Sequence, residues 1–192
     1  MFGASDLAFS VGYGNKLQDN LFYGAAVKFI YSNIAGYSST GAAVDFGMHY
    51  IAIPNRMILG ASVSNLGTQF DPYIATREDL PLDVKVGIRL MPEHLPAMLL
   101  LDFHRLNESQ DHFFNRLNAF SVGVEFSTSE NFQLRFGYNN QQRQDFKVLS
   151  SSGLAGISLG AGLLFAPYTF DYAFNSMGSI GSLHRVSIGV TF

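Results

Sequence analysis

Apolar and polar positions alternate one residue at a time in eleven separate stretches of this chain. In the last stretch, Val186, Ile188, Val190 and Phe192 share one face of an extended strand, and the residues between them share the other. This period of two predicts β-strands with one apolar face and one polar face. The predicted strands cover residues 7–14, 23–32, 42–50, 57–64, 82–90, 97–104, 120–126, 132–139, 155–163, 168–175 and 184–192.

Composition indicates that the apolar face does not meet water. Charged residues make up 14% of the chain, against roughly 25% in soluble domains. No apolar run approaches the ~20 residues of a membrane-spanning helix, and a closed barrel satisfies its backbone hydrogen bonds in lipid without helices. We therefore predict an all-β, antiparallel up-and-down transmembrane β-barrel, with residues 1–192 in a single barrel domain of the outer membrane and lipid against the apolar face. A soluble β-sandwich or lipocalin-like barrel would also alternate, with its apolar face inward.

The lengths of the connections predict the orientation of the barrel. Short and longer connections alternate, and outer-membrane barrels have short periplasmic turns, longer extracellular loops and a periplasmic carboxyl terminus. We therefore expect the long connections outside and the short ones inside. The short connections are 18–20, 53–55, 91–96, 128–131 and 166–167, and the long ones are 33–40, 66–80, 107–116, 140–153 and 175–183.

The same topology starts the first strand at the extracellular end. Single-chain bacterial barrels have an even number of strands and begin in the periplasm. We therefore expect an odd number of strands before Met1, so that the chain is the carboxyl-terminal portion of a longer barrel; an error of one in the strand count is the alternative. Residues 1–7 have no basic region and no apolar run, so we do not expect them to form a signal peptide.

Several segments carry a family resemblance. They are 65–69 (NLGTQ) with 76–82 (TREDLPL), 28–32 (KFIYS), 137–144 (GYNNQQRQ), and 171–174 (DYAF) with 184–187 (HRVS). Together they resemble the PorV/PorQ family, outer-membrane proteins of the type IX secretion system of Bacteroidota and relatives. The segments 65–69, 28–32 and 137–144 are closer to the PorQ branch, and the ending at 184–187 is closer to the general PorV-like pattern.

The resemblance implies a FadL-like barrel of about fourteen strands, of which about eleven would be present here. It also implies a non-enzymatic component of the secretion and surface-attachment machinery. In this family, PorV carries or holds cargo and the sortase at the cell surface, and PorQ is thought to anchor PorZ. We therefore expect a PorZ-like or sortase-like protein partner, with a FadL-like transporter of hydrophobic small molecules as the alternative.

Charged residues on the polar faces of the strands are candidates for the barrel interior. They could line a channel, or they could form cross-strand ion pairs in a plugged lumen, since charges in low-dielectric surroundings need partners. The candidates are Lys28, Asp45, Asp83, Lys85, Arg89, Asp102, Glu125, Arg135, Asp171 and Arg185.

Residues in two long connections are candidates for binding a partner. Loops at the mouth of a rigid barrel are common binding positions, and exposed aromatic residues beside Arg suit a protein interface. The alternative is that these loops pack over the lumen as lids. The candidates are Gln69, Phe70, Tyr73, Arg77, Glu78, Arg143, Gln144 and Phe146.

The sequence contains no convincing catalytic, metal or cofactor site. The five histidines lack metal-ligand spacing and the chain has no cysteine. Asp102 and His104 lie two apart on one strand, where we expect polar neighbours such as Arg89 or Glu125 to satisfy them. The letters Gly156-x-Ser158-x-Gly160 match a nucleophile elbow, but they lie within a predicted strand, where glycines leave room for bulky interior groups. We expect no enzyme activity, and a net charge of -3 gives no indication of nucleic-acid binding.

Overall fold

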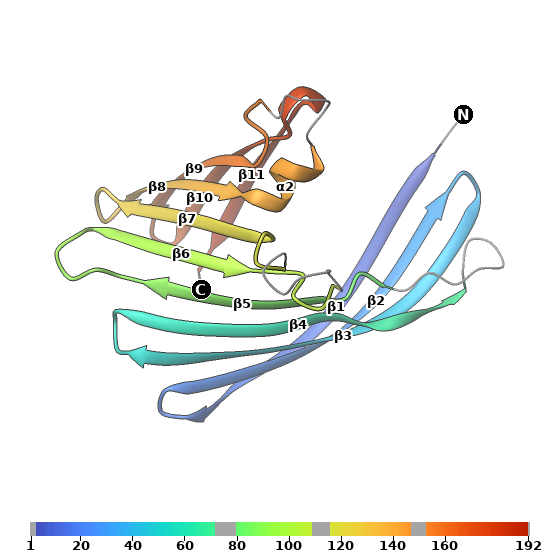
Figure 1. Cartoon of the computed structure of the whole chain (residues 1–192), viewed down its shortest axis with the longest axis horizontal. Coiled ribbons are helices and arrows are strands. Elements are labelled where there is room, and N and C mark those ends of the chain that lie inside the picture. Colours follow the sequence, from blue (N-terminus) through green and yellow to red (C-terminus); the bar gives the residue numbers. More distant parts are fainter. Residues whose placement is uncertain (1–2, 72–79, 109–115, 147–152, 192) are drawn as a thin grey trace. The chain divides into compact units, whose positions relative to one another are not determined.

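The computed structural model describes residues 3–71, 80–108, 116–146 and 153–191. Within these ranges, eleven antiparallel strands follow one another in a single sheet in chain order (Figure 1). This confirms the up-and-down arrangement predicted from the alternation. The strands are β1 (Ala4–Gln18), β2 (Leu21–Ile34), β3 (Tyr37–Ile53), β4 (Met57–Asp71), β5 (Asp83–Leu90), β6 (Ala97–Phe103), β7 (Phe120–Ser127), β8 (Phe132–Asn139), β9 (Ile157–Phe165), β10 (Tyr168–Ser176) and β11 (Ser182–Val190).

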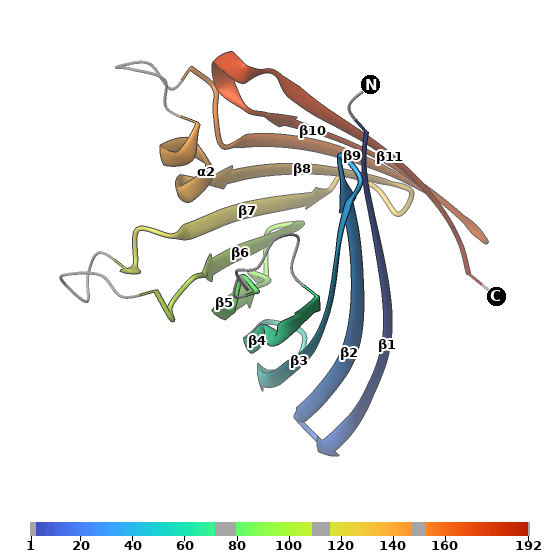
Figure 2. The same ribbon diagram turned by 90° about the vertical axis from the view of Figure 1, so that its right-hand side faces the viewer.

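In the described part of the chain, two short helices, α2 and η1, lie outside the sheet. The α-helix α2 (Asn140–Asp145) directly follows β8, and the 3-10 helix η1 (Gly178–Ile180) joins β10 to β11 (Figure 2). Neither of the helices in the described ranges is long and apolar enough to cross a membrane.

The chain forms two compact units. The first unit comprises residues 1–52, 59–86 and 104–109, and the second comprises residues 53–58, 87–103 and 110–192. In the first unit, the register of β1, β2 and β3 aligns Val11, Val27 and Val44 across one face. In the second unit, β6 to β11 pair as successive antiparallel neighbours.

The first four strands are longer than the alternation predicted. They contain 15, 14, 17 and 15 residues, whereas a tilted strand needs about 9–11 residues to cross the membrane. The prediction of a long connection at 33–40 is wrong, because β2 and β3 meet at a two-residue turn. Ala35 and Gly36 both have positive φ, 53° and 88°, as a tight hairpin turn with the twist of its strands requires. Connection length therefore does not identify the extracellular side at this turn.

The predicted loop 66–80 is also shorter at its start, because β4 continues to Asp71. Its backbone pairs with β3 beyond the point where the apolar alternation ends: an added side chain at Gly41 would lie 3.1 Å from the carbonyl oxygen of Thr68. Backbone pairing, which needs no particular side chain, therefore extends the strand past the apolar pattern.

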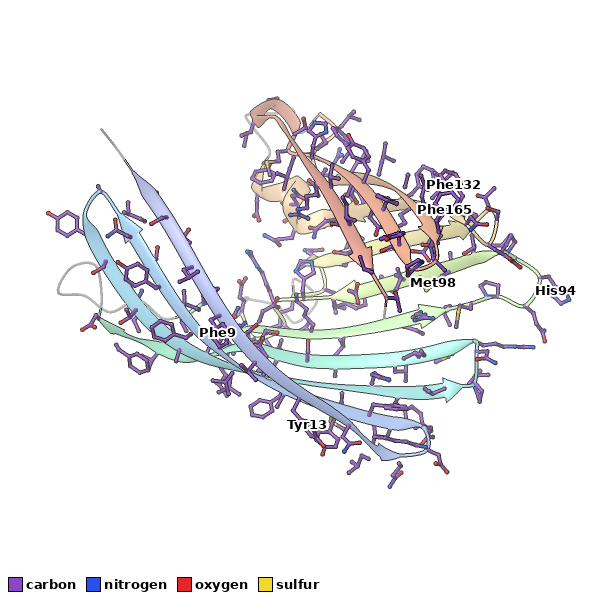
Figure 3. All side chains as sticks on the ribbon, turned by 180° about the vertical axis from the view of Figure 1, so that it is seen from behind. Phe9, Tyr13, His94, Met98, Phe132 and Phe165 are labelled. Carbon is purple, nitrogen blue, oxygen red and sulfur yellow. The ribbon has the colours of Figure 1, made fainter. Side chains whose placement is uncertain are left out.

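The apolar face of the sheet is not covered by protein. In the described part of the chain no large side chain is fully buried, and the buried apolar residues are all alanines. Phe9 and Tyr13 of β1 (Figure 3) are 66% and 64% exposed. Val186 of β11 is 76% exposed. A soluble β-domain would bury such side chains in a core. An apolar face this large and open favours contact with lipid.

Candidate functional site

The polar face of the first unit carries a cluster centred on Asp45 of β3. Lys28 Nζ on β2 lies 2.9 Å from Asp45 Oδ2 and donates to Asn65 Oδ1 on β4 at 2.5 Å. The backbone N–H of Asn65 donates to Asp45 Oδ1 at 2.8 Å, and Asn65 Nδ2 donates to the carbonyl of Pro81 at 2.9 Å. Asn65 has a φ of 63°, which asparagine tolerates better than most residues. The cluster therefore ties three strands together around one left-handed residue.

A second aspartate in the first unit makes the same arrangement. The backbone N–H of Arg105, whose φ is 54°, donates to Asp83 Oδ1 at 2.8 Å. Lys85 Nζ lies 3.0 Å from Asp83 Oδ2. In both clusters, one carboxylate oxygen accepts a hydrogen bond from the backbone N–H of a residue with positive φ. The other carboxylate oxygen forms an ion pair with a lysine. Lys28, Asp45 and Lys85 therefore form ion pairs with other residues of the sheet.

The polar face of the second unit is dominated by Arg135 of β8. Its Nε lies 2.7 Å from Glu125 Oε2 on β7, its Nη1 lies 2.5 Å from Asp171 Oδ1 on β10, and its Nη2 donates to Gln133 Oε1 at 2.6 Å. Glu125 lies directly opposite Arg135 in the register, but Asp171 is two strands away. Arg135 therefore links three strands and contacts two carboxylates.

The glycines of β9 make that reach possible. An added Cβ at Gly162 would lie 2.9 Å from Asp171 Oδ1 and 3.3 Å from Arg135 Nη2, and one at Gly160 would lie 3.3 Å from Arg135 Cβ. The guanidinium of Arg135 thus lies over Gly160 and Gly162, which have no side chains to block it. This confirms that Gly160, which lies within β9, leaves room for a bulky polar group. The prediction is wrong for Gly156, which precedes β9 in a turn and has a φ of 83°.

Three predicted interior charges are not in these clusters. Across the described residues, no ion pair joins Asp102 to Arg89, and no hydrogen bond joins it to Glu125, whose Oε2 binds Arg135. The prediction that these neighbours satisfy Asp102 is therefore wrong. The Nε atom of Arg89 is buried and has no hydrogen-bond partner. Arg185 lies on β11 opposite Ala173. His104 makes an interaction of its own. No group of three or more metal-ligating side chains occurs within the ranges described.

The predicted partner-binding residues fall in three places. Gln69 and Phe70 lie near the C-terminal end of β4, and the side chain of Phe70 is 53% exposed. Arg143 and Gln144 lie in α2, and Phe146 is its C-cap. Tyr73, Arg77 and Glu78 lie outside the described residues.

The helix α2 lies at the end of β8 (Figure 2), and amide side chains hold it there. The side chain of Asn139 accepts from the backbone N–H of Gln142 at 2.7 Å, which caps the helix. Gln142 Nε2 donates to Asn175 Oδ1 on β10 at 2.8 Å, and Asn175 Nδ2 donates back at 3.3 Å. Asn140 Nδ2 donates to the carbonyl of Asn118 at 2.8 Å. The helix is therefore held in place while Gln144 stays exposed. The sequence placed these residues in a loop, because a six-residue helix has too few turns to show a period.

Comparisons with known proteins identify the fold and not the family. No protein-family model matches the sequence. No curated protein matches it. The structure is similar to the crystal structure of the Ralstonia pickettii toluene transporter TbuX, with a TM-score of 0.61 and 12% sequence identity. The similarity shows a FadL-like barrel fold. It covers 96% of this chain, which spans 66% of the length of the TbuX chain.

Proposed function

We propose that this protein is a non-enzymatic outer-membrane barrel that holds a surface protein at the extracellular ends of its strands. The uncovered apolar face and the FadL-like fold support a membrane position. The resemblance of segments 65–69 and 137–144 to the PorV/PorQ family supports a role in type IX secretion and surface attachment, with a PorZ-like or sortase-like partner.

The observation that carries the proposal is the fixed position of α2. Its cap and its paired amides with Asn175 give the end of β8 a rigid surface. A rigid surface loses little conformational entropy on binding. The second unit offers the exposed hydrogen-bonding side chain of Gln144, and the first unit offers, by itself, the exposed ring of Phe70. Protein interfaces use both kinds of side chain.

Partner capture tests the proposal. We expect Phe70→Ala, Arg143→Ala and Gln144→Ala together to lower recovery of the surface partner in a pull-down by about tenfold, the effect of losing roughly 1.4 kcal/mol of binding energy. Folding should be unchanged, because Arg143→Ala keeps the Cβ that packs at Gly156. Glu130→Ala, an exposed change in the short turn between β7 and β8, is the control and should capture normally. Full capture by the triple variant would contradict the proposal.

A FadL-like transporter of hydrophobic small molecules is the second candidate. The similarity to a toluene transporter favours it. Under this function, the triple variant captures no less partner than the wild type, and cells that lack the protein take up less of an aromatic hydrocarbon such as toluene.

A further inference from the structure

A polar cluster interrupts the apolar face of β10 and β11. His184 Nδ1 lies 2.8 Å from the hydroxyl oxygen of Tyr172, and His184 Nε2 lies 3.1 Å from the hydroxyl oxygen of Ser182. The register sets Tyr172 opposite Val186, and the alternation along β11 puts Ser182 and His184 on the same face as Val186. The three polar side chains are exposed. The cluster therefore lies on the face that we assign to lipid.

The position of the cluster along β11 places it at the level of the lipid headgroups. The connection before β11 is one of those expected outside, and the strand runs from it toward the carboxyl terminus. A tilted strand needs about 9–11 residues to cross the membrane, and β11 has nine. Ser182 is its first residue and His184 its third. A charge near the interface costs much less than one at the midplane, so a protonated histidine is tolerated here.

Neighbouring rings hold the imidazole, and no acid lies beside it. Phe174 is directly opposite His184 in the register and packs edge-on against it, with ring centroids 5.4 Å apart. The ring centroid of Tyr172 lies 6.1 Å away. The charged residues in the described parts of β9, β10 and β11 are Asp171 and Arg185, which lie opposite Ser187 and Ala173 on the other face. Within these three strands, a positive charge on His184 therefore has no counter-ion.

We propose that Tyr172, Ser182 and His184 bind the phosphate group of an outer-leaflet lipid. A protonated imidazole donates from both nitrogens. The oxygens of Tyr172 and Ser182 then accept from it, and both hydroxyl hydrogens are free to donate to a third group. Two hydroxyl donors beside one positive charge suit a phosphate, whose oxygens form strong charge-assisted hydrogen bonds. The proposal rests on this face meeting lipid, and it goes beyond partner capture at the extracellular ends of the strands.

A tryptophan probe beside the cluster tests the site, because the chain contains no tryptophan. The full chain with Val186→Trp is reconstituted in phosphatidylcholine vesicles. Part of the lipid is replaced by an equal mole fraction of either phosphatidic acid or phosphatidylcholine with brominated acyl chains, which quench nearby tryptophan. We expect phosphatidic acid to be enriched about fivefold over phosphatidylcholine at the probe, an effect in the range of one hydrogen bond to a charged group.

Two variants and a second probe position provide the comparison. His184→Gln, combined with the Val186→Trp probe, keeps a hydrogen-bonding side chain without the charge and should abolish the enrichment. Ser187→Ala changes the opposite face of the same strand and should leave the enrichment unchanged. Val27→Trp places the probe on the apolar face of the first unit, where Val27 is 60% exposed, and should show equal quenching by the two lipids.

Four results would overturn the proposal. They are equal quenching by the two lipids at Val186→Trp, undiminished enrichment in His184→Gln, the same enrichment at Val27→Trp, and displacement of the lipid by an excess of inorganic phosphate. If His184→Gln fails to show heat-modifiable migration, Tyr172→Phe decides. It keeps the ring and removes one hydroxyl, so the enrichment should fall by about half or more, and full enrichment would contradict the site. Partner capture is measured separately, so either proposal can fail alone.

Discussion

Replacement of Val27 by arginine is expected to prevent most of the protein from reaching its folded form in the membrane. Val27 lies between Val11 and Val44 on the apolar face and is 60% exposed. A lipid-facing arginine costs about 2–4 kcal/mol at the middle of a membrane barrel, a large part of the total stability of a typical protein. The measurement is the fraction of protein in outer-membrane preparations that shows heat-modifiable migration.

The adjacent residue provides a matched control. Ala26 lies on the opposite face, between Gly12 on β1 and Asp45 on β3. Ala26→Arg introduces the same charge one position away, beside a carboxylate and opposite a residue with no side chain. We expect nearly normal folding. Equal losses in both variants would mean that the two faces do not differ in their surroundings.

Removal of Arg135 should produce the next largest effect. Arg135→Met leaves Glu125 and Asp171 without their cation on β7 and β10. Loss of one partner from a fully buried ion pair costs about 3–5 kcal/mol. The Arg135 side chain is 39% exposed, so solvent screening reduces the loss, and we expect about 2 kcal/mol. The measurement is the urea midpoint of unfolding in lipid vesicles, followed by heat-modifiable migration.

A compensated variant separates charge imbalance from lost packing. Arg135→Met combined with Glu125→Gln and Asp171→Asn removes all three charges together. Replacing a whole ion-pair cluster by neutral groups is often close to neutral in stability. We therefore expect this variant to recover most of the lost stability. If it unfolds as readily as Arg135→Met alone, the arginine stabilises the sheet by packing and not by pairing its two acids.

The alternation of residues was sufficient to predict the class and the number of strands. The period of two shows directly which side chains share a face, and this held from β1 to β11. It did not predict the ends of β1 to β4, because backbone hydrogen bonds continue where the apolar pattern stops. The turn at Ala35 and Gly36 was missed because Ala at positive φ is uncommon and the usual Asn-Gly sign of a hairpin is absent.

The candidate site, like the fold, was predicted only in part from the sequence. The alternation along each strand placed Glu125, Arg135 and Asp171 on the polar face. Only the register between β7 and β8 sets Glu125 directly opposite Arg135. The reach to Asp171 across β9 depends on Gly160 and Gly162, whose role requires the three strands to be seen together. Asn65 was missed for a related reason, since its backbone N–H becomes a partner of Asp45 only at a left-handed position that the sequence does not reveal.

Site-directed fluorescence on β11 tests the central claim, that the apolar face meets lipid and the polar face does not. The sequence contains no cysteine, so Arg185→Cys, Val186→Cys, Ser187→Cys and Ile188→Cys can each carry one probe. In vesicles of brominated phospholipid, we predict strong quenching at positions 186 and 188 and little at 185 and 187. Equal quenching at all four positions, or quenching greater at 185 and 187, would contradict the account.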